Sequence, residues 1–445
     1  MQRGLCASRR ALHRYLPAVV GVVCAVAGGA EGGTVPKDPD PDFSFEDTVK
    51  MGPFHATPFL VIKDLGYDDN IRLTPEGRQT GDYSVTIGPG ARAVVPFGRL
   101  TALSLWNEID YVAYANETDL NTVNGEFRGK LHFYLRDFIV FADGKYRSYR
   151  ERPDDEIDFR MRHHTGDARA GFTWRRPNER GRIDLYRQSI RENFSTSSEP
   201  NVPPEFDGDL AADAGERRAE SLDREEDYLW VDTRLKIRPR TSLLFDFQTG
   251  GIDFDEDDTN RDSTVVATTA GFEFDPSGPL RGYIRGGIKH LEPDDSRLEG
   301  YSGPIGRAQL YWRALDRALV KFLYKRDTVP TSLGENIFAL TDTKGLGYEH
   351  FFTRRISVEL GRSIADNSLP TELSDLSSCT GTGSGIVCDE KLREDRVTTD
   401  TFTVRYAMRP GVKIGLVLRR WDRESNFDLE DVTRNTIYTT VEYVP

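Results

Sequence analysis

The feature that most constrains the fold is an alternation of apolar and polar residues with a period of two, repeated along most of the chain. In GEFRGKLHFYL, Phe127 and Leu131 share one face of an extended segment, and Arg128 and Lys130 share the other. The stretches YLWVDTRLKIR and VKIGLVLRR show the same pattern. Such alternation is typical of β-strands that separate an apolar from a polar environment. Each stretch has about the 9–11 residues that a tilted strand needs to cross a bilayer.

Short connections recur between these strands, in the order PFGR, LRDF, RRPNERG, RPRT, DPSGPLRG, ALDRAL, TRRI and RPGV. Five of the seven intervals between them are close to 39 residues, enough for two strands, one tight turn and one longer loop. The two longer intervals contain long loops at about 194–227 and 366–396. Eight turns join sixteen strands, and a first strand near 58–67 with a last near 435–444 makes eighteen. Sixteen strands is the alternative if one hairpin does not pair.

These patterns predict an all-β fold, a transmembrane antiparallel up-and-down β-barrel of about 18 strands with short periplasmic turns and long extracellular loops. Only 38% of the residues are hydrophobic and 29% are charged. That is apolar-poor for a packed core, but it suffices for a barrel in which each strand has one wet face. A soluble β-propeller also repeats near 40 residues, but its blades use four shorter strands each.

The first 27 residues predict a secretory signal peptide. Four arginines precede the apolar run YLPAVVGVVCAVAGGA, and the AVA before Gly28 fits a small-residue cleavage pattern. Residues 28–56 are then a short periplasmic segment, too short for the plug domain of a TonB-dependent receptor, and 57–445 form the barrel. An exported barrel of this kind is expected in the bacterial outer membrane.

The predicted mature chain keeps two cysteines, Cys379 and Cys388, in CTGTGSGIVC. Two cysteines close together in a glycine-rich loop of an exported protein predict a disulfide. Two free thiols are the alternative. Two cysteines without a nearby histidine make a poor zinc site.

Two acidic stretches contain candidate metal ligands. Asp68 and Asp69, in GYDDNI, end the first predicted strand, where Asx side chains satisfy backbone donors. A divalent ion that bridges them to lipopolysaccharide or to a neighbouring loop is the alternative. Asp253, Asp255 and Asp257 take the first, third and fifth positions of a calcium loop, but its glycine and glutamate are missing. A solvated acidic loop is therefore favoured over loose calcium binding, and we expect no metal site and no cofactor.

A start of the form PF, about ten residues, then GYDDNI, followed by such hairpins, resembles the putative β-barrel porin 2 family of Gram-negative outer membranes. The resemblance covers most of residues 50–445, and GYDDNI is its one sharp motif. It implies an outer-membrane barrel, often associated with export of exopolysaccharide or capsule. The chain departs from the usual pattern of outer-membrane barrels at its end, TTVEYVP, which has no terminal aromatic residue.

If the apolar face of each strand is turned to lipid, the other face lines the lumen and is rich in basic residues. Inward acidic residues are fewer, so the acids concentrate in the loops although the net charge is −13. A basic wall concentrates anions, whereas Arg and Asp pairing into a rigid ladder is the alternative, and both can hold together. The predicted lumen-lining residues are Arg128, Lys130, Lys145, Arg147, Arg169, Arg175, Arg234, Lys236, Arg285, Lys289, Arg307, Arg313, Arg405, Lys413 and Arg419.

These features predict a porin-like channel for passage or export of polar, anionic solutes, with a surface polysaccharide as a candidate cargo. The expected partners are outer-membrane lipid and lipopolysaccharide, the barrel-assembly machinery and polysaccharide-export proteins, and no nucleic acid. One alternative is a non-conducting structural or assembly component of a polysaccharide-export machine. A barrel hydrolase is a further alternative, although the sequence has no G-x-S-x-G, H-E-x-x-H or P-loop motif.

Overall fold

The computed structural model contains nineteen β-strands and one short 3₁₀ turn, Thr118–Leu120. It describes residues 49–51, 54–75, 77–151, 161–176, 180–195, 221–255, 261–275, 277–331, 333, 336–380, 387–427 and 431–444. The strands are β1 Val49–Met51, β2 Phe54–Asp68, β3 Asp82–Phe97, β4 Thr101–Tyr114, β5 Thr122–Tyr134, β6 Phe138–Glu151, β7 Met161–Arg175, β8 Gly181–Ser195, β9 Arg224–Arg238, β10 Thr241–Phe254, β11 Ser263–Phe274, β12 Leu280–Pro293, β13 Tyr301–Leu315, β14 Ala318–Pro330, β15 Phe338–Phe351, β16 Ile356–Thr380, β17 Val387–Arg409, β18 Val412–Ser425 and β19 Val432–Tyr443.

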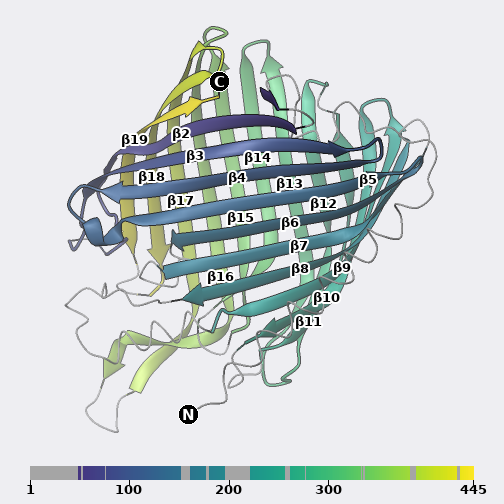
Figure 1. Ribbon diagram of the computed structural model, residues 1–445. Coiled ribbons are helices and arrows are strands. Elements are labelled where there is room, and N and C mark those ends of the chain that lie inside the picture. Colours follow the sequence, from purple (N-terminus) through teal and green to yellow (C-terminus); the bar gives the residue numbers. More distant parts are fainter. Residues whose placement is uncertain are drawn as a thin grey trace, which may run out of the picture.

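The strands β2 to β19 form one closed antiparallel barrel (Figure 1). Each strand pairs with its neighbours in sequence, and β19 pairs with β2 to close the ring. The short strand β1 pairs with the first residues of β2, beyond the part of β2 that β19 covers. The predicted count of eighteen barrel strands is confirmed, and the barrel begins at Phe54, slightly before the expected residue 57. No helix among the described residues is long and apolar enough to cross a membrane.

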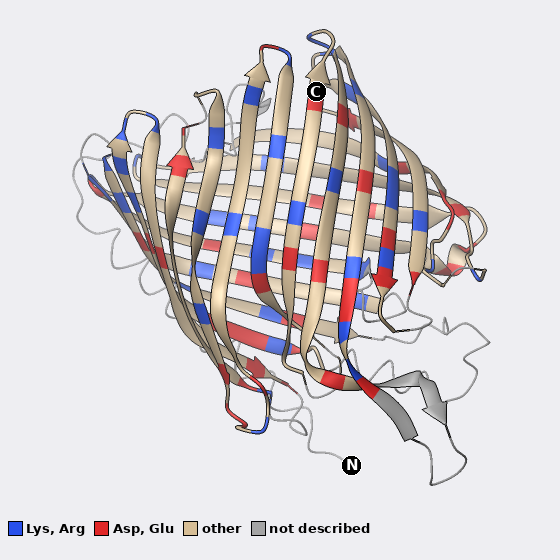
Figure 2. Ribbon diagram, turned by 180° about the vertical axis from the view of Figure 1, so that it is seen from behind, with Lys and Arg blue, Asp and Glu red and all other residues tan. Residues whose placement is uncertain are grey.

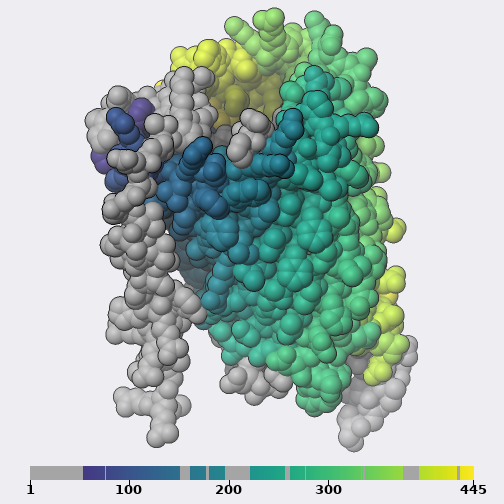
Figure 3. All heavy atoms as spheres, turned by 90° about the vertical axis from the view of Figure 1, so that its right-hand side faces the viewer, coloured from purple at the N-terminus to yellow at the C-terminus, as the bar shows by residue number. Residues whose placement is uncertain are grey.

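The alternation in the sequence becomes two faces of the wall. Phe127 and Tyr146 are opposite each other on β5 and β6 and are exposed on the outer face, whereas Glu126 is buried on the inner face. The same alternation places Tyr67, Ile284 and many other large apolar side chains on the outside. Figure 3 shows the closely packed side chains of neighbouring strands on one outer side of the barrel. Apolar residues exposed around a whole cylinder are the property of a barrel surrounded by lipid.

The two ends of the barrel differ in their connections. Eight short turns join β3 to β4, β5 to β6 and so on to β17 and β18, and the C-terminus lies at this short-turn end (Figure 1). The nine other connections lie at the opposite, long-loop end. The predicted long loop 194–227 corresponds to the connection between Ser195 and Arg224. The segment 366–396, expected as a loop, is instead mostly an extension of β16 and β17, which pair through Asp366 and Arg396 and onward after a register break. Charged and polar residues can continue a two-stranded ribbon because neither of its faces has to be apolar in water.

Close approach of neighbouring backbones requires glycine at Gly287 on β12. A Cβ atom there would overlap the backbone carbonyl oxygen of Thr268 on β11. We expect Gly287→Ala to destabilise the barrel by roughly 1–3 kcal/mol, since the strands must separate locally. Urea unfolding in detergent micelles measures this. Gly144→Ala is the control, because a Cβ there meets no atom within 4 Å, and equal effects of the two substitutions would contradict the steric argument.

Candidate functional site

The structure places all fifteen predicted lumen-lining residues on the inner series of their strands, that is, at the alternate positions whose side chains point into the barrel. Each alternates with outward apolar residues, as Arg128 does with Phe127 and Lys413 does with Ile414. Ten of the fifteen are solvent-exposed although they point into the barrel, so water reaches the inner wall. These ten are Arg128, Arg169, Arg175, Arg234, Lys236, Arg307, Arg313, Arg405, Lys413 and Arg419.

Many of these cations pair with carboxylates of the inner wall. Near the short-turn end, Lys321 Nζ lies 3.0 Å from Glu349 Oε2 and 2.7 Å from Glu359 Oε1. Arg405 Nη1 lies 3.1 Å from Glu349 and 2.6 Å from Glu359. This four-residue cluster lines a cavity of about 870 Å³ together with Tyr311 and other residues of β13 to β19. The wall therefore contains the ion-pair ladder that the sequence left open.

The same pairing recurs around the ring. Arg285 Nη1 lies 2.7 Å from Asp246 Oδ2, and Arg234 Nε lies 2.7 Å from Glu273 Oε2. Glu126 accepts from Arg128 and lies 3.4 Å from Lys145 Nζ. Figure 2 shows Lys and Arg interleaved with Asp and Glu along the strands.

The cations are more exposed than the carboxylates that they pair with. Arg128 is 49% exposed and Glu126 only 8%, and Arg405 is 48% exposed and Glu349 only 10%. The reason is length: Arg and Lys extend past the short Asp and Glu side chains, which stay close to the backbone. Three described pairs of Lys or Arg on the inner series depart from this: Lys289 with Asp327, at 13% and 37%, Arg224 with Glu226, at 13% each, and Arg393 with Asp395, at 7% and 8%. A solute in the lumen therefore meets mainly positive groups, even where the local charges balance.

Other basic residues of the inner wall contact aromatic rings. Arg307 lies 5.9 Å from the centre of the Tyr283 ring, and Arg147 lies 5.7 Å from that of Tyr149. Arg419 Nη2 donates to the hydroxyl of Tyr438 at 3.1 Å. Cation–π contacts orient a guanidinium group without neutralising its charge.

The sequence analysis missed Lys63, which donates to Asp110 at 2.8 Å and to Glu108 on the inner wall of β4. The register of β2 against β3 shifts between Lys63 and Gly66, and the neighbouring Asp64 has a positive φ of 53°. Such a bulge changes which face the following residues take. A simple alternation could not assign a face to Lys63.

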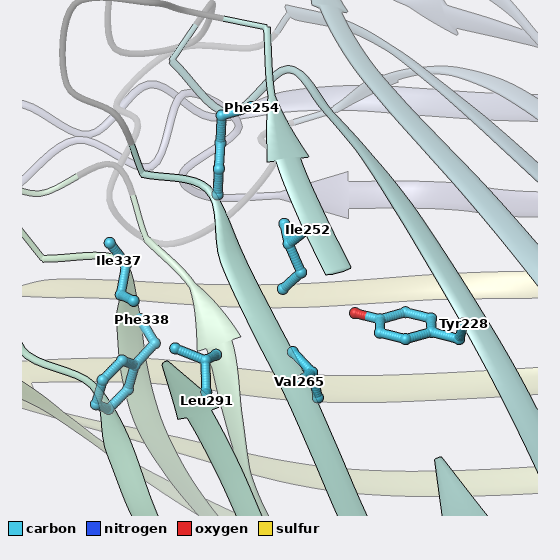
Figure 4. Packing of buried hydrophobic residues seen from close by; sticks show 7 residues of the cluster. All are labelled: Tyr228, Ile252, Phe254, Val265, Leu291, Ile337 and Phe338. Atoms are coloured by element: carbon cyan, nitrogen blue, oxygen red, sulfur yellow. The ribbon is translucent and has the colours of Figure 1, made fainter. Parts of the chain in front are cut away.

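A second feature that the sequence did not predict is an inward hairpin tip at the long-loop end, formed by the end of β14 and the start of β15. Ile337 and Phe338 pack against Phe254, Leu291 and other inward residues of β9 to β12 (Figure 4). The pairing of β14 with β13 ends at Arg326, which leaves the rest of the tip outside the ladder with β13. The tip thus lies against the inner face of the wall and narrows this mouth.

Arg261, in the connection between β10 and β11, holds the inward hairpin tip in place. It is 4% exposed, donates to the backbone carbonyls of Thr331 and Ser221, and lies 4.4 Å from the centre of the Phe254 ring. On the other side of the tip, Asn336 Oδ1 accepts from the backbone N–H of Thr371 at 2.9 Å. The connection between β10 and β11, on one side, and strand β16, on the other, therefore hold the tip in place.

The two aspartates of GYDDNI point to opposite faces and do not share a site. Asp68 is buried and accepts from Arg434, whose Nε lies 2.9 and 3.1 Å from the two carboxylate oxygens and whose Nη2 also donates to Oδ2. Asp69 is on the outer face and accepts from the backbone N–H and the amide of Asn435, at 2.6 and 2.8 Å. Asn70, fully buried, donates to the carbonyls of Thr74 and Thr433. The motif therefore joins β2 to β19 at the closure of the barrel.

The other candidate sites remain predictions. Asp255 pairs with Arg191 at 3.1 Å, and Asp257 lies outside the described residues. Within the described part of the chain, no cluster of three or more His, Cys, Asp or Glu is placed to hold a metal ion. The side chains of Cys379 and Cys388 also lie outside the described residues, so the disulfide stays a prediction.

Two carboxylates in the connections keep their charge at mildly acidic pH. Hydrogen bonds from Arg297 lower the pKa of Asp295 to about 2. Hydrogen bonds from Ser277 lower the pKa of Asp275 in a short turn. These two carboxylates therefore stay charged well below neutral pH.

Comparison with known proteins gives one clear family match. The family model described as "Putative beta-barrel porin 2" matches residues 48–443. No curated protein matches the chain. The solved structures include OccK3 (OpdO) of Pseudomonas aeruginosa, with a TM-score of 0.47 at 10% identity, covering 90% of this chain and 97% of that one. OccK11 (OpdR) of the same organism gives 0.46 at 11%, covering 91% and 99%.

A structure described as "Bacterial polysaccharide outer membrane secretin" gives a TM-score of 0.37 at 11% identity, covering 88% of this chain and 99% of that one. These structural similarities are too weak to say anything of the solute. The family model, in contrast, extends over the whole barrel from β1 to β19. The chain belongs to the putative beta-barrel porin 2 family.

Proposed function

We propose that this barrel is an outer-membrane channel that passes polar anions. The observation that supports the proposal most is the difference in exposure between the inner cations and their partner carboxylates. Because Arg128, Arg405 and their counterparts extend into the lumen above buried acids, the local concentration of anions rises along the wall. The proposal is a channel function and not an enzymatic one.

An anionic surface polysaccharide is the candidate cargo, passed outward through the barrel. Alternating cations and aromatic rings, such as Arg128 with Trp106 at 4.7 Å, suit a polymer that carries both carboxylates and sugar faces. The partners in this proposal are outer-membrane lipid and lipopolysaccharide around the barrel, the barrel-assembly machinery, and polysaccharide-export proteins.

A non-conducting structural or assembly component of an export machine is the second candidate. The inward hairpin tip favours it, because Ile337 and Phe338 pack onto inward residues of β9 to β12 and so extend into the long-loop mouth. A barrel hydrolase is a third candidate, which no arrangement of the described residues favours.

Reversal potentials in planar bilayers under a KCl gradient test the channel proposal. We expect a reversal potential with the sign of the chloride equilibrium potential, and cation selectivity or a lack of conductance would contradict the proposal. In the double variant Lys321→Gln and Arg405→Gln, anion selectivity should fall, since two positive charges of the inner wall are lost. In Glu349→Gln with Glu359→Gln, it should rise.

The outward pair Arg362 and Asp400 provides a matched control. Arg362 Nε lies 2.6 Å from Asp400 Oδ1, on the face that carries Leu360 and Phe402. Arg362→Gln with Asp400→Asn removes two charges close to the same strands but outside the lumen. Selectivity should not change in this variant.

A further inference from the structure

The two ends of the barrel carry opposite charge. Among the described residues, the nine connections at the long-loop end contain 10 Asp and Glu and 4 Lys and Arg. The described residues of the eight short turns contain 8 Lys and Arg and 3 Asp and Glu. In the described part of the chain, the connections at one mouth are therefore negative and those at the other are positive.

The positive charge of the short-turn end comes from arginines, which we call the arginine collar. All of them are exposed, and they come from six of the eight turns, so they surround much of the rim. Turns along the upper margin of Figure 2 carry this blue colour. The collar consists of Arg99, Arg136, Arg176, Arg180, Arg240, Arg317, Arg354 and Arg355.

Further cations line the inside of the same mouth, one or two residues from the ends of their strands. They are on the inner series of β7, β8, β9, β12 and β13. Arg182 pairs with Asp184 at 2.7 Å, and Arg281 lies 5.2 Å from the centre of the Tyr311 ring. Arg175, Lys236 and Arg313 have no acidic partner among the described residues. The positive charge therefore continues from the rim into the lumen.

We propose that this opposition of charge makes the channel directional: polyvalent anions enter at the short-turn mouth, and the acidic long-loop mouth opposes their entry from the other side. The inference rests on the proposed anion channel. Fixed charges of one sign at a mouth raise the concentration of the opposite ion by potentials of one or more kT. Such a potential acts across a mouth only while the Debye length is comparable with the width of the mouth. The Debye length is about 30 Å at 0.01 M salt and about 3 Å at 1 M.

The test is the current–voltage relation of single channels in symmetric KCl. A biotin group at the C-terminus, which lies at the short-turn end, fixes the orientation, because streptavidin blocks only from the side where the collar lies. At 0.01 M KCl we expect the larger current, by about threefold for a potential of about one kT, when chloride is driven in through the short-turn mouth. The ratio should approach one at 1 M KCl.

Two matched variants separate the collar from the rest of the molecule. In Arg99→Gln, Arg240→Gln, Arg354→Gln, Arg355→Gln, the current ratio should fall towards one. In Arg78→Gln with Arg297→Gln, two exposed arginines are lost at the long-loop end, and the ratio should rise. Heat-modifiability on gels checks that each variant is folded, and Arg354→Gln with Arg355→Gln replaces the fourfold variant if that one fails.

Each outcome is decisive. An anion-selective channel with equal currents at both polarities in 0.01 M KCl overturns directionality and leaves the proposed function standing. Rectification that the collar variant does not change overturns the role of the collar. A cation-selective or non-conducting barrel overturns the proposed function, and directionality with it.

Discussion

In Arg434→Met, the barrel is expected to lose roughly 3–5 kcal/mol of unfolding free energy, because the substitution leaves the Asp68 carboxylate buried and unpaired. The ion pair joins the first and last strands, and no other strand pair of the ring has so few paired positions. Urea unfolding in detergent micelles, followed by the mobility difference between folded and heated protein on gels, measures the loss.

Its neighbour in the same motif provides the control. Asp69→Asn should cost less than about 1 kcal/mol, since this carboxylate is on the outer face and an amide can keep the contact with Asn435. The double variant Asp68→Asn with Arg434→Met should recover part of the loss, because no buried charge remains. Similar stabilities of Arg434→Met and Asp69→Asn would show that closure does not depend on the ion pair.

Single-channel conductance is expected to rise when the inward hairpin tip is released. Arg261→Gln removes charge-assisted hydrogen bonds to backbone carbonyls, each worth about 1.5–3 kcal/mol, and the contact with the Phe254 ring. Ile337→Asn weakens the same attachment through the apolar cluster. Both variants should give a larger and noisier open current than the parent protein.

Arg297→Gln is the control for the tip. It changes a charge in the connection between β12 and β13 at the same mouth, but the Arg297 side chain is exposed and pairs with Asp295 of its own connection. Its conductance should stay close to that of the parent. An unchanged conductance in Arg261→Gln and Ile337→Asn would mean that the tip does not narrow the conducting path.

The sequence predicted the wall of the barrel well, because each strand must sort its side chains between lipid and water with a period of two. That constraint fixed the strand count and the inner face of residues such as Arg128 and Lys413. It failed where the constraint ends. Lys63 stands directly before a register shift, and the tip at Ile337 lies beyond the last residue of β14 that pairs with β13. Beyond Asp366, both faces of the β16 extension can be polar. The sequence therefore has no alternation of apolar and polar residues there that would distinguish a strand from a loop.

The aspartates of GYDDNI show the same limit. Sequence adjacency suggested one shared environment, but neighbouring residues of a strand point in opposite directions. The partner of Asp68 is 366 residues away, on the last strand. Closure of a ring brings the two ends of the chain together, and no local pattern contains that information.

The extension of β16 and β17 is a two-stranded ribbon with two free edges. β15 stops pairing with β16 at Ser368, and β18 stops pairing with β17 at Asp395. Open edges of this kind invite strands of other molecules to add to them. The exposed Glu390 and Glu394 place negative charges along the extended part of β17. Neighbouring copies of the protein would have to bury those charges to pair their strands along this edge. The ribbon can therefore extend beyond the barrel wall and still discourage aggregation.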